Sequence, residues 1–319
     1  MSPSREGPGF IALEGGDARV ELVPTQGGLV RSLECFGTEW LLAGDELTPK
    51  AGTHPWKLSG WVECAPSAGG GTVPEWVKGV GGTVLPAGGT ARTQAPETSL
   101  ATDHEGHKCT MRWTGERMPW QLERTILVRP DGAVEARYEA ITTGRERMPF
   151  LWSAWITLPL RSSTRLKVSD AGRLRVASLH GAAAGEPREA ALKWPRLTLD
   201  KRLRDLQSPH SVPSKTTLAT WVDLATQRNV IQVQDDDARL SVTLAGGVPY
   251  LGVMIDRAGM QQARARRALR RSGVPSFSLV PSLGAPDRYS DALGGWQSVS
   301  WLVPGEPRRW TMTIRGGAA

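Results

Sequence analysis

Two acidic residues are the candidates for proton-transfer chemistry in this chain. Glu63 lies in the apolar segment Trp61-Val62-Glu63-Cys64, and Asp287 follows Pro286 late in the sequence. Two carboxyl groups can act as acid and base when burial separates their pKa values. The alternative is structural: Glu63 orders its own loop, and Asp287 completes a turn. The pair is therefore a hypothesis about catalysis.

Tryptophan is the second feature with chemical meaning. The chain has 13 Trp against 4 Phe and 3 Tyr. An indole offers a broad apolar face and one N–H donor, which suits the C–H face of a pyranose ring. Packing of a wide core explains most of the thirteen equally well. The composition alone gives only a weak indication of carbohydrate binding.

The sequence predicts no metal or cofactor site. His104 and His107 are spaced i, i+3 in a turn-like stretch without a third ligand, whereas a structural zinc needs four. Asp235-Asp236-Asp237 fits the tip of a hairpin and has no EF-hand spacing. The three cysteines are widely spaced, so they indicate neither a disulfide framework nor a CxxC knuckle.

The net charge of +7 raises the question of a polyanionic partner. Most basic residues are scattered, and arginine dominates them, so we do not predict nucleic-acid binding. The one dense cluster, Arg264–Arg271, is interpreted as a solvated turn or helix, with an acidic partner as the alternative.

Strand signals dominate the chain. Polar and apolar residues alternate over 18–23, and hairpins are expected over 121–140 and 229–244, with a last strand over 310–315. The 36 glycines and 23 prolines interrupt short strands at regular intervals, which is typical of a β-sandwich. We predict an all-β fold, a large antiparallel β-sandwich, as one domain over residues 1–319, with residues 1–10 a candidate disordered stretch.

Targeting signals are missing from the sequence. It has no run of about 20 apolar residues, so we expect no membrane span. The first residues, Met1-Ser2-Pro3-Ser4-Arg5, are not followed by an apolar signal-peptide region. We therefore expect a cytoplasmic protein.

Three segments, in this order, carry a family resemblance: 59–67 (SGWVECAPS), 148–155 (MPFLWSAW) and 279–287 (LVPSLGAPD). Together they resemble the aldose 1-epimerase, or galactose mutarotase-like, family. Shorter matches extend the resemblance from about residue 20 to 315. It implies a large β-sandwich with a sugar-binding cleft and a reaction that interconverts sugar anomers.

The residues that the family uses for this chemistry are replaced here. Anomer exchange needs a base for the anomeric hydroxyl and an acid for the ring oxygen. By the resemblance, Gly88 stands at a position of a family histidine, Trp155 at that of the catalytic histidine, and Val280 at that of the catalytic glutamate. Trp cannot titrate and Val cannot act as a base. Arg92 matches the family's sugar-binding arginine.

The leading hypothesis is a protein that binds a carbohydrate or sugar-like metabolite without the standard mutarotase chemistry. A second hypothesis is an active epimerase or isomerase in which Glu63 and Asp287 replace the usual pair. A third is a non-catalytic interaction protein whose cleft is filled by Trp155. The sequence leaves open the sugar, the oligomeric state and whether Trp155 stacks on a ligand. The predicted cleft is lined by Trp61, Glu63, Arg92, Trp152, Trp155 and Asp287.

Overall fold

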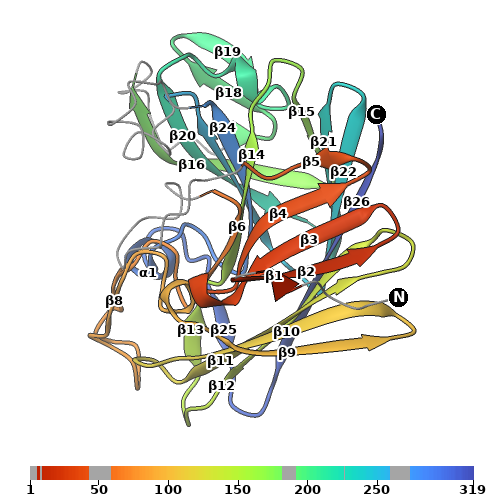
Figure 1. The fold of residues 1–319 in the computed structure, drawn as a ribbon. Helices are drawn as coiled ribbons and strands as arrows, with labels where there is room; N and C mark the ends of the chain where they lie inside the picture. The colour runs from red at the N-terminus through yellow and green to blue at the C-terminus, as the bar shows by residue number, and fades with distance from the viewer. Residues whose placement is uncertain (1–5, 8, 43–58, 182–191, 226, 259–273) are drawn as a thin grey trace, which may run out of the picture.

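Two large antiparallel sheets make up most of the molecule. A computed structural model describes residues 6–7, 9–42, 59–181, 192–225, 227–258 and 274–319. The larger sheet has twelve strands in the order β1-β2-β3-β4-β6-β14-β24-β23-β20-β16-β17, with β5 paired to β4 (Figure 1). The other has eight strands in the order β15-β21-β22-β26-β12-β11-β10-β9. The predicted all-β sandwich is confirmed.

The strand bounds show how widely the larger sheet draws on the chain. Its strands are β1 (Glu6–Gly7), β2 (Phe10–Gly15), β3 (Ala18–Val23), β4 (Leu29–Cys35), β5 (Thr38–Glu39), β6 (Trp61–Cys64), β14 (Ser153–Pro159), β16 (Ala171–Gly181), β17 (Leu192–Lys193), β20 (Thr216–Leu224), β23 (Tyr250–Asp256) and β24 (Ser276–Ser282). The smaller sheet is built mainly from sequential hairpins. Its strands are β9 (Glu97–Asp103), β10 (Gly106–Thr114), β11 (Trp120–Val128), β12 (Val134–Thr142), β15 (Arg165–Val168), β21 (Arg228–Asp235), β22 (Ala238–Ala245) and β26 (Arg308–Ala318).

Short elements connect and flank these sheets. The pairs are β7 (Gly71–Thr72) with β8 (Val84–Leu85), β13 (Met148–Phe150) with β25 (Ser300–Leu302), and β18 (Arg196–Leu199) with β19 (Arg202–Asp205). In the part of the chain that the structure describes, the one α-helix is α1 (Tyr289–Leu293), and no helix is long and apolar enough to cross a membrane. The Arg264–Arg271 cluster lies outside the described residues.

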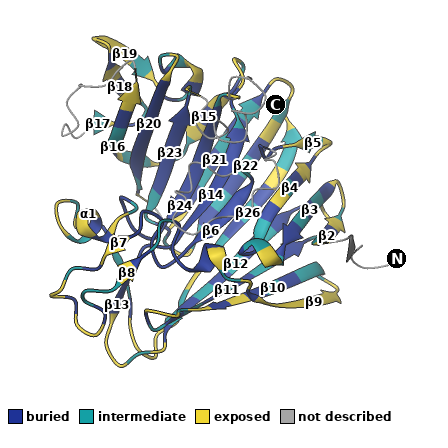
Figure 2. Ribbon diagram, turned by 60° about the vertical axis from the view of Figure 1, so that its left-hand side comes forward, coloured by how far each residue is buried: buried dark blue, intermediate teal, exposed yellow. Residues whose placement is uncertain are grey.

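The main core lies between the two sheets. In β12, Val134, Ala136, Tyr138 and Ala140 are buried while the residues between them are half-exposed, as the period of two requires. Inward residues of the larger sheet, including those of β3, β14 and β24, belong to the same hydrophobic cluster. Figure 2 shows the buried residues following the long strands of both sheets.

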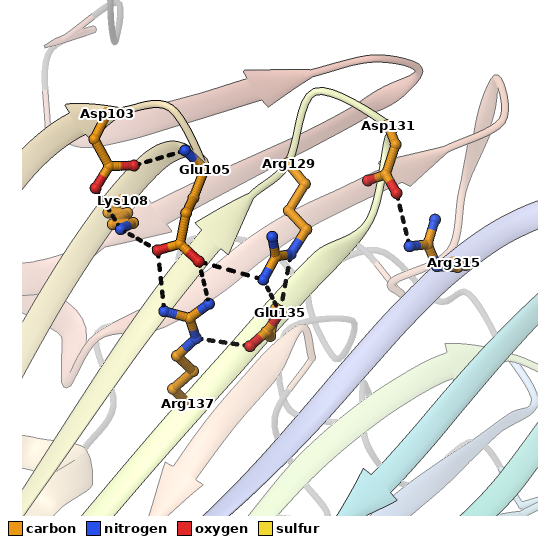
Figure 3. Close-up of polar contacts among 8 residues, drawn as sticks. All are labelled: Asp103, Glu105, Lys108, Arg129, Asp131, Glu135, Arg137 and Arg315. Carbon is orange, nitrogen blue, oxygen red and sulfur yellow. Dashed lines mark hydrogen bonds and ion pairs between the residues drawn. The ribbon is translucent and has the colours of Figure 1, made fainter.

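A group of ion pairs lies on the eight-stranded sheet near the turns that join β9 to β10 and β11 to β12 (Figure 3). Glu105 accepts hydrogen bonds from Arg137 at 2.9 Å and Lys108 at 2.6 Å, and Glu135 accepts from Arg129 at 2.8 Å and Arg137 at 2.7 Å. Exposed pairs of this kind each stabilise a fold only slightly. They do show that Arg129 and Arg137 on this face are paired with carboxylates of the chain itself.

Candidate functional site

Glu63 is the centre of a buried polar network between the sheets. Its side chain has no solvent exposure. The carboxylate forms an ion pair with Arg124 of β11, whose Nη1 lies 2.9 Å from Oε1. Three further donors complete its coordination: the Trp61 indole at 3.0 Å, the Tyr138 hydroxyl at 2.9 Å and the Trp152 indole at 2.7 Å. Such charge-assisted hydrogen bonds are the strong ones in a protein interior.

Strand alternation explains why Glu63 points into this core. Trp61 and Glu63 of β6 face the eight-stranded sheet, while Val62 and Cys64 face the other way. Burial, and then the charge of Glu63, raises the pKa of Tyr138 well above its usual value. The phenol therefore stays a hydrogen-bond donor to the carboxylate. The network therefore holds Glu63 as the buried partner of Arg124, without contact to solvent.

A second hydrophobic cluster lies on the opposite face of the twelve-stranded sheet, and we call it the outer-face cluster. It includes Trp155 of β14, Trp221 of β20 and Val280 of β24. Trp155 is 1% exposed and its indole N–H donates to Ser153 Oγ at 3.1 Å. The other buried members are Val62, Cys64, Ala68, Ala219, Met254 and Ala285, with Leu29, Ala177, Tyr250 and Trp296 half-buried around them.

The predicted cleft residues are thus divided between two faces of one sheet. Trp61, Glu63 and Trp152 lie together in the inter-sheet core, whereas Trp155 lies in the outer-face cluster. The six residues therefore do not all lie on one face of the sheet, and the substrate-binding roles of Trp61, Arg92, Trp152 and Trp155 stay predictions. A proton-transfer role for Glu63 with Asp287 stays a prediction, and nothing in this geometry supports it.

Arg92 lies in the short 3-10 helix η3 (Ala91–Thr93) and Asp287 in a loop, and the charges of both act on Cys64. The Arg92 guanidinium is fully buried, and that burial lowers its pKa. Burial raises the pKa of the Cys64 thiol; the charge of Arg92 opposes this shift, and those of Glu63 and Asp287 add to it. Asp287 is half-buried, and its carbonyl oxygen accepts from Gly69 N–H and Ser67 Oγ, each at 2.7 Å.

Gly88 shows why a histidine does not fit this loop as it stands. Its φ of +87° belongs to the left-handed region that favours glycine. A Cβ at this position would lie 2.3 Å from Arg92 Nε. The buried Arg92 side chain occupies the space that a larger residue at 88 would need, so the present position of Arg92 requires glycine there.

The remaining candidates of the sequence have local roles. Asp235 ends β21 at the hairpin with β22, pairs with Arg161 and accepts from Ser163 Oγ at 2.7 Å. His107 Nδ1 is hydrogen-bonded to Thr102 Oγ1 at 3.1 Å. Among the residues that the structure describes, no group of three or more His, Cys, Asp or Glu could hold a metal ion.

Sequence reasoning missed the partners of both clusters. Arg124 lies on the buried face of β11, between Leu122 and Ile126 on that same face. A charged residue at an inward position of a strand is a detectable signal, because such a residue needs a buried partner. Trp221 and Trp296 carried no comparable signal, since any of the thirteen tryptophans could pack a core.

Similarity to known proteins is found by comparing structures and not by comparing sequences. No family model matches the sequence, and no curated protein matches it. The crystal structure of the Slr1438 protein from Synechocystis sp. PCC 6803 is similar with a TM-score of 0.67 and 17% identity, covering 100% of this chain and 99% of that one. A putative aldose 1-epimerase from Escherichia coli K12 has a TM-score of 0.67 and 14% identity, covering 97% and 99%.

A third similar structure is that of galactose 1-epimerase from Lactobacillus acidophilus NCFM, with a TM-score of 0.63 and 14% identity. It covers 97% of this chain and 94% of that chain. Likeness over whole chains at this low identity is evidence of a shared fold. The chain therefore has the galactose mutarotase-like fold, which the sequence resemblance implied.

Proposed function

We propose that this protein binds a carbohydrate or sugar-like metabolite on the outer face of its twelve-stranded sheet and does not exchange anomers by the usual acid and base. The observation that carries the proposal is that Trp155 and Val280 lie on the adjacent strands β14 and β24, within the outer-face cluster. By the sequence resemblance, these are the positions of the family's histidine and glutamate.

The chemistry of the cluster supports binding without proton transfer. An indole only donates a hydrogen bond and valine has no polar atom. Among the described buried members only Cys64 can ionise, and burial raises the pKa of its thiol. A buried thiol of this kind is a poor base at neutral pH. The half-buried rings at the border of the cluster, Tyr250 and Trp296, can by contrast offer apolar surface on which a sugar packs.

The test is anomer-exchange NMR on the full chain with neutral aldoses and hexose 6-phosphates. The α and β signals report exchange rates, and ligand line broadening reports binding. Line broadening at an unchanged exchange rate is expected. Accelerated exchange of any sugar would refute the proposal and favour the epimerase hypothesis. Loss of that exchange in Glu63→Gln would count for the epimerase hypothesis only if the variant stays folded, because the same change breaks the buried ion pair with Arg124.

A second candidate function is a non-catalytic interaction protein with an occluded cleft. The near-complete burial of Trp155 favours it, because a ring that is 1% exposed cannot stack on a ligand without movement of its neighbours. Absence of line broadening for every sugar would support this candidate over the first. The expected cytoplasmic location stays a prediction under either function.

A further inference from the structure

Arg175 is held between aromatic rings at the border of the outer-face cluster. Its guanidinium carbon lies 4.2 Å from the centroid of the Trp296 ring and 5.8 Å from that of Tyr250. Nη2 donates to Asp223 Oδ1 at 2.8 Å, and Nη1 donates to Ser298 Oγ at 3.1 Å. A guanidinium stacked and paired in this way is fixed in position and orientation.

Three strands and one loop build this group. Arg175 lies on β16, Asp223 on β20 and Tyr250 on β23, which are neighbours in the large sheet. Trp296 and Ser298 come from the loop after α1. Both Tyr250 and Trp296 pack against the outer-face cluster, so the group borders the face proposed to bind a sugar.

The loop does not depend on Arg175 for its attachment. Main-chain hydrogen bonds run from Trp296 N–H to Asp291 at 3.0 Å and from Ser298 N–H to Ala292 at 2.8 Å. A third runs from Ala285 N–H to the carbonyl of Ser298 at 2.8 Å. These backbone hydrogen bonds hold the loop in place. The ion pair of Arg175 with Asp223 and its stacking on Trp296 are therefore not the only contacts that attach the loop.

The exposed part of the group is a hydrogen-bond acceptor. The Arg175 side chain is 11% exposed and that of Asp223 is 36% exposed. Only Oδ1 of Asp223 accepts a hydrogen bond from another described residue. At 36% exposure the Asp223 carboxylate can also accept through Oδ2 from a hydroxyl donor. Arg175 Nε is buried and has no partner among the described residues, which leaves one donor for a bound group or water.

Charge decides which class of ligand this group suits. The positive charge of Arg175 is balanced by Asp223 within the ion pair, so the group has no net charge to attract an anion. A phosphate approaching Asp223 Oδ2 would meet a carboxylate of like charge. Hydroxyl groups can instead donate to Oδ2 while the apolar face of a ring packs on Trp296 or Tyr250.

We propose that Arg175, Asp223, Tyr250 and Trp296 form a subsite for a neutral sugar or polyol, which discriminates against phosphorylated sugars. This rests on the proposed carbohydrate-binding function and names the class of ligand for the same face. Asp223 accepts the ligand's hydroxyls, Arg175 holds the carboxylate in place, and the two rings supply the apolar surface.

The test compares the binding of galactose and glucose with that of their 6-phosphates by NMR titration, for the wild-type chain and Asp223→Asn. The wild type is expected to bind a neutral sugar at least tenfold more tightly than its phosphate. Asp223→Asn keeps the side-chain shape but removes a charge-assisted acceptor, so neutral-sugar affinity should fall about tenfold to a hundredfold. Arg175 then carries an unbalanced charge, and the preference should move toward the phosphate.

A second variant of the subsite and one control variant separate binding from folding. Trp296→Ala should weaken neutral-sugar binding, whereas Trp76→Ala, which truncates a tryptophan that is 64% exposed, should not. Thermal unfolding of each variant shows whether it is folded, and Trp296→Ala carries the test if Asp223→Asn does not fold.

The outcomes separate the subsite from the proposed function. Sugar binding that both Asp223→Asn and Trp296→Ala leave unchanged would overturn the subsite but keep the carbohydrate-binding function. Tighter binding of a phosphate by the wild type would overturn the neutral class. Absence of binding to all four compounds would overturn the subsite together with the function on which it rests.

Discussion

Replacing Glu63 by glutamine should destabilise the fold strongly and reveal no catalytic role. The carboxylate accepts from Trp61, Arg124, Tyr138 and Trp152, three of them on Oε1 and one on Oε2. A glutamine amide keeps one oxygen and turns the other acceptor into a donor. In its best orientation the oxygen serves the three donors, and the NH2 group faces the Trp152 N–H, which lies 2.7 Å from Oε2.

The expected magnitude follows from the lost charge. Removing one partner of a buried ion pair costs about 3–5 kcal/mol, because the other charge stays buried without compensation. Arg124 would be that charge, since its side chain has no exposure. The total stability of a domain is about 5–15 kcal/mol, so the variant should still fold at 25 °C with a much reduced reserve.

Urea unfolding of the wild type and Glu63→Gln measures this directly, as a lower midpoint at an unchanged m-value. The matched control is Glu123→Gln on the same strand as Arg124. Glu123 pairs with Arg112 at 2.6 Å, and their side chains are 37% and 46% exposed, so its loss should cost at most about 1 kcal/mol.

A double variant tests whether the cost comes from the uncompensated charge. Arg124→Met in the Glu63→Gln background removes the second buried charge, so the double variant should lose less than the sum of the two single losses. A loss below about 1 kcal/mol for Glu63→Gln, comparable to an exposed pair, would refute the assignment of Glu63 as the centre of the core network.

Three further predictions follow from separate parts of the structure. Hydrogen bonds from Arg137 and then Lys108 lower the pKa of Glu105 from 4.5 to about 2, so its contribution to stability is present above pH 4.5 and lost as the pH falls toward 2. Thermal unfolding against pH should therefore show a smaller acid-induced loss for Glu105→Gln than for the wild type. An equal loss would contradict the assignment. Gly88→Ala should destabilise the fold more than Gly37→Ala. Both glycines have a positive φ, but only a Cβ at Gly88 meets another group, the Arg92 side chain. Urea unfolding midpoints measure the difference, and equal midpoints would count against the contact. Burial raises the thiol pKa of every cysteine in the native protein, so thiol labelling at neutral pH should be negligible there. In denaturant all three thiols should be labelled. Rapid labelling of the native protein would refute this. The three cysteines are Cys35, with a thiol pKa of about 12, Cys109, with a thiol pKa of about 11, and Cys64.

The fold was predictable because its strands and turns have clear local sequence patterns. The hairpin over 121–140 is found as β11 and β12, with Pro130-Asp131-Gly132 between the strands. Polar and apolar residues alternate clearly in these strands, because one face is buried and the other is half-exposed. The second hairpin, β21 with β22, follows the same rule. Local pattern and turn chemistry were sufficient there.

The site was less predictable because β6 has no exposed face. All four of its residues are buried, so the strand pattern does not say which face Glu63 occupies. Only its partners decide this, and Arg124 and Tyr138 are 61 and 75 residues away in the sequence. A resemblance between short segments aligned Glu63 with a cleft, but it could not supply that tertiary information.

The two faces of the central strands determine which variants can report on function. Loss of activity or binding in a Glu63 variant would measure damage to the core between the sheets, because that carboxylate contacts no solvent. Trp155 and Val280 face the other way, but they are themselves buried, so their truncation also carries a packing cost. Asp223 and Trp296 are only half-buried at the border of that same face, so their substitution should carry a smaller packing cost than that of Trp155 or Val280. Binding measurements on these two residues are therefore the ones that separate function from stability.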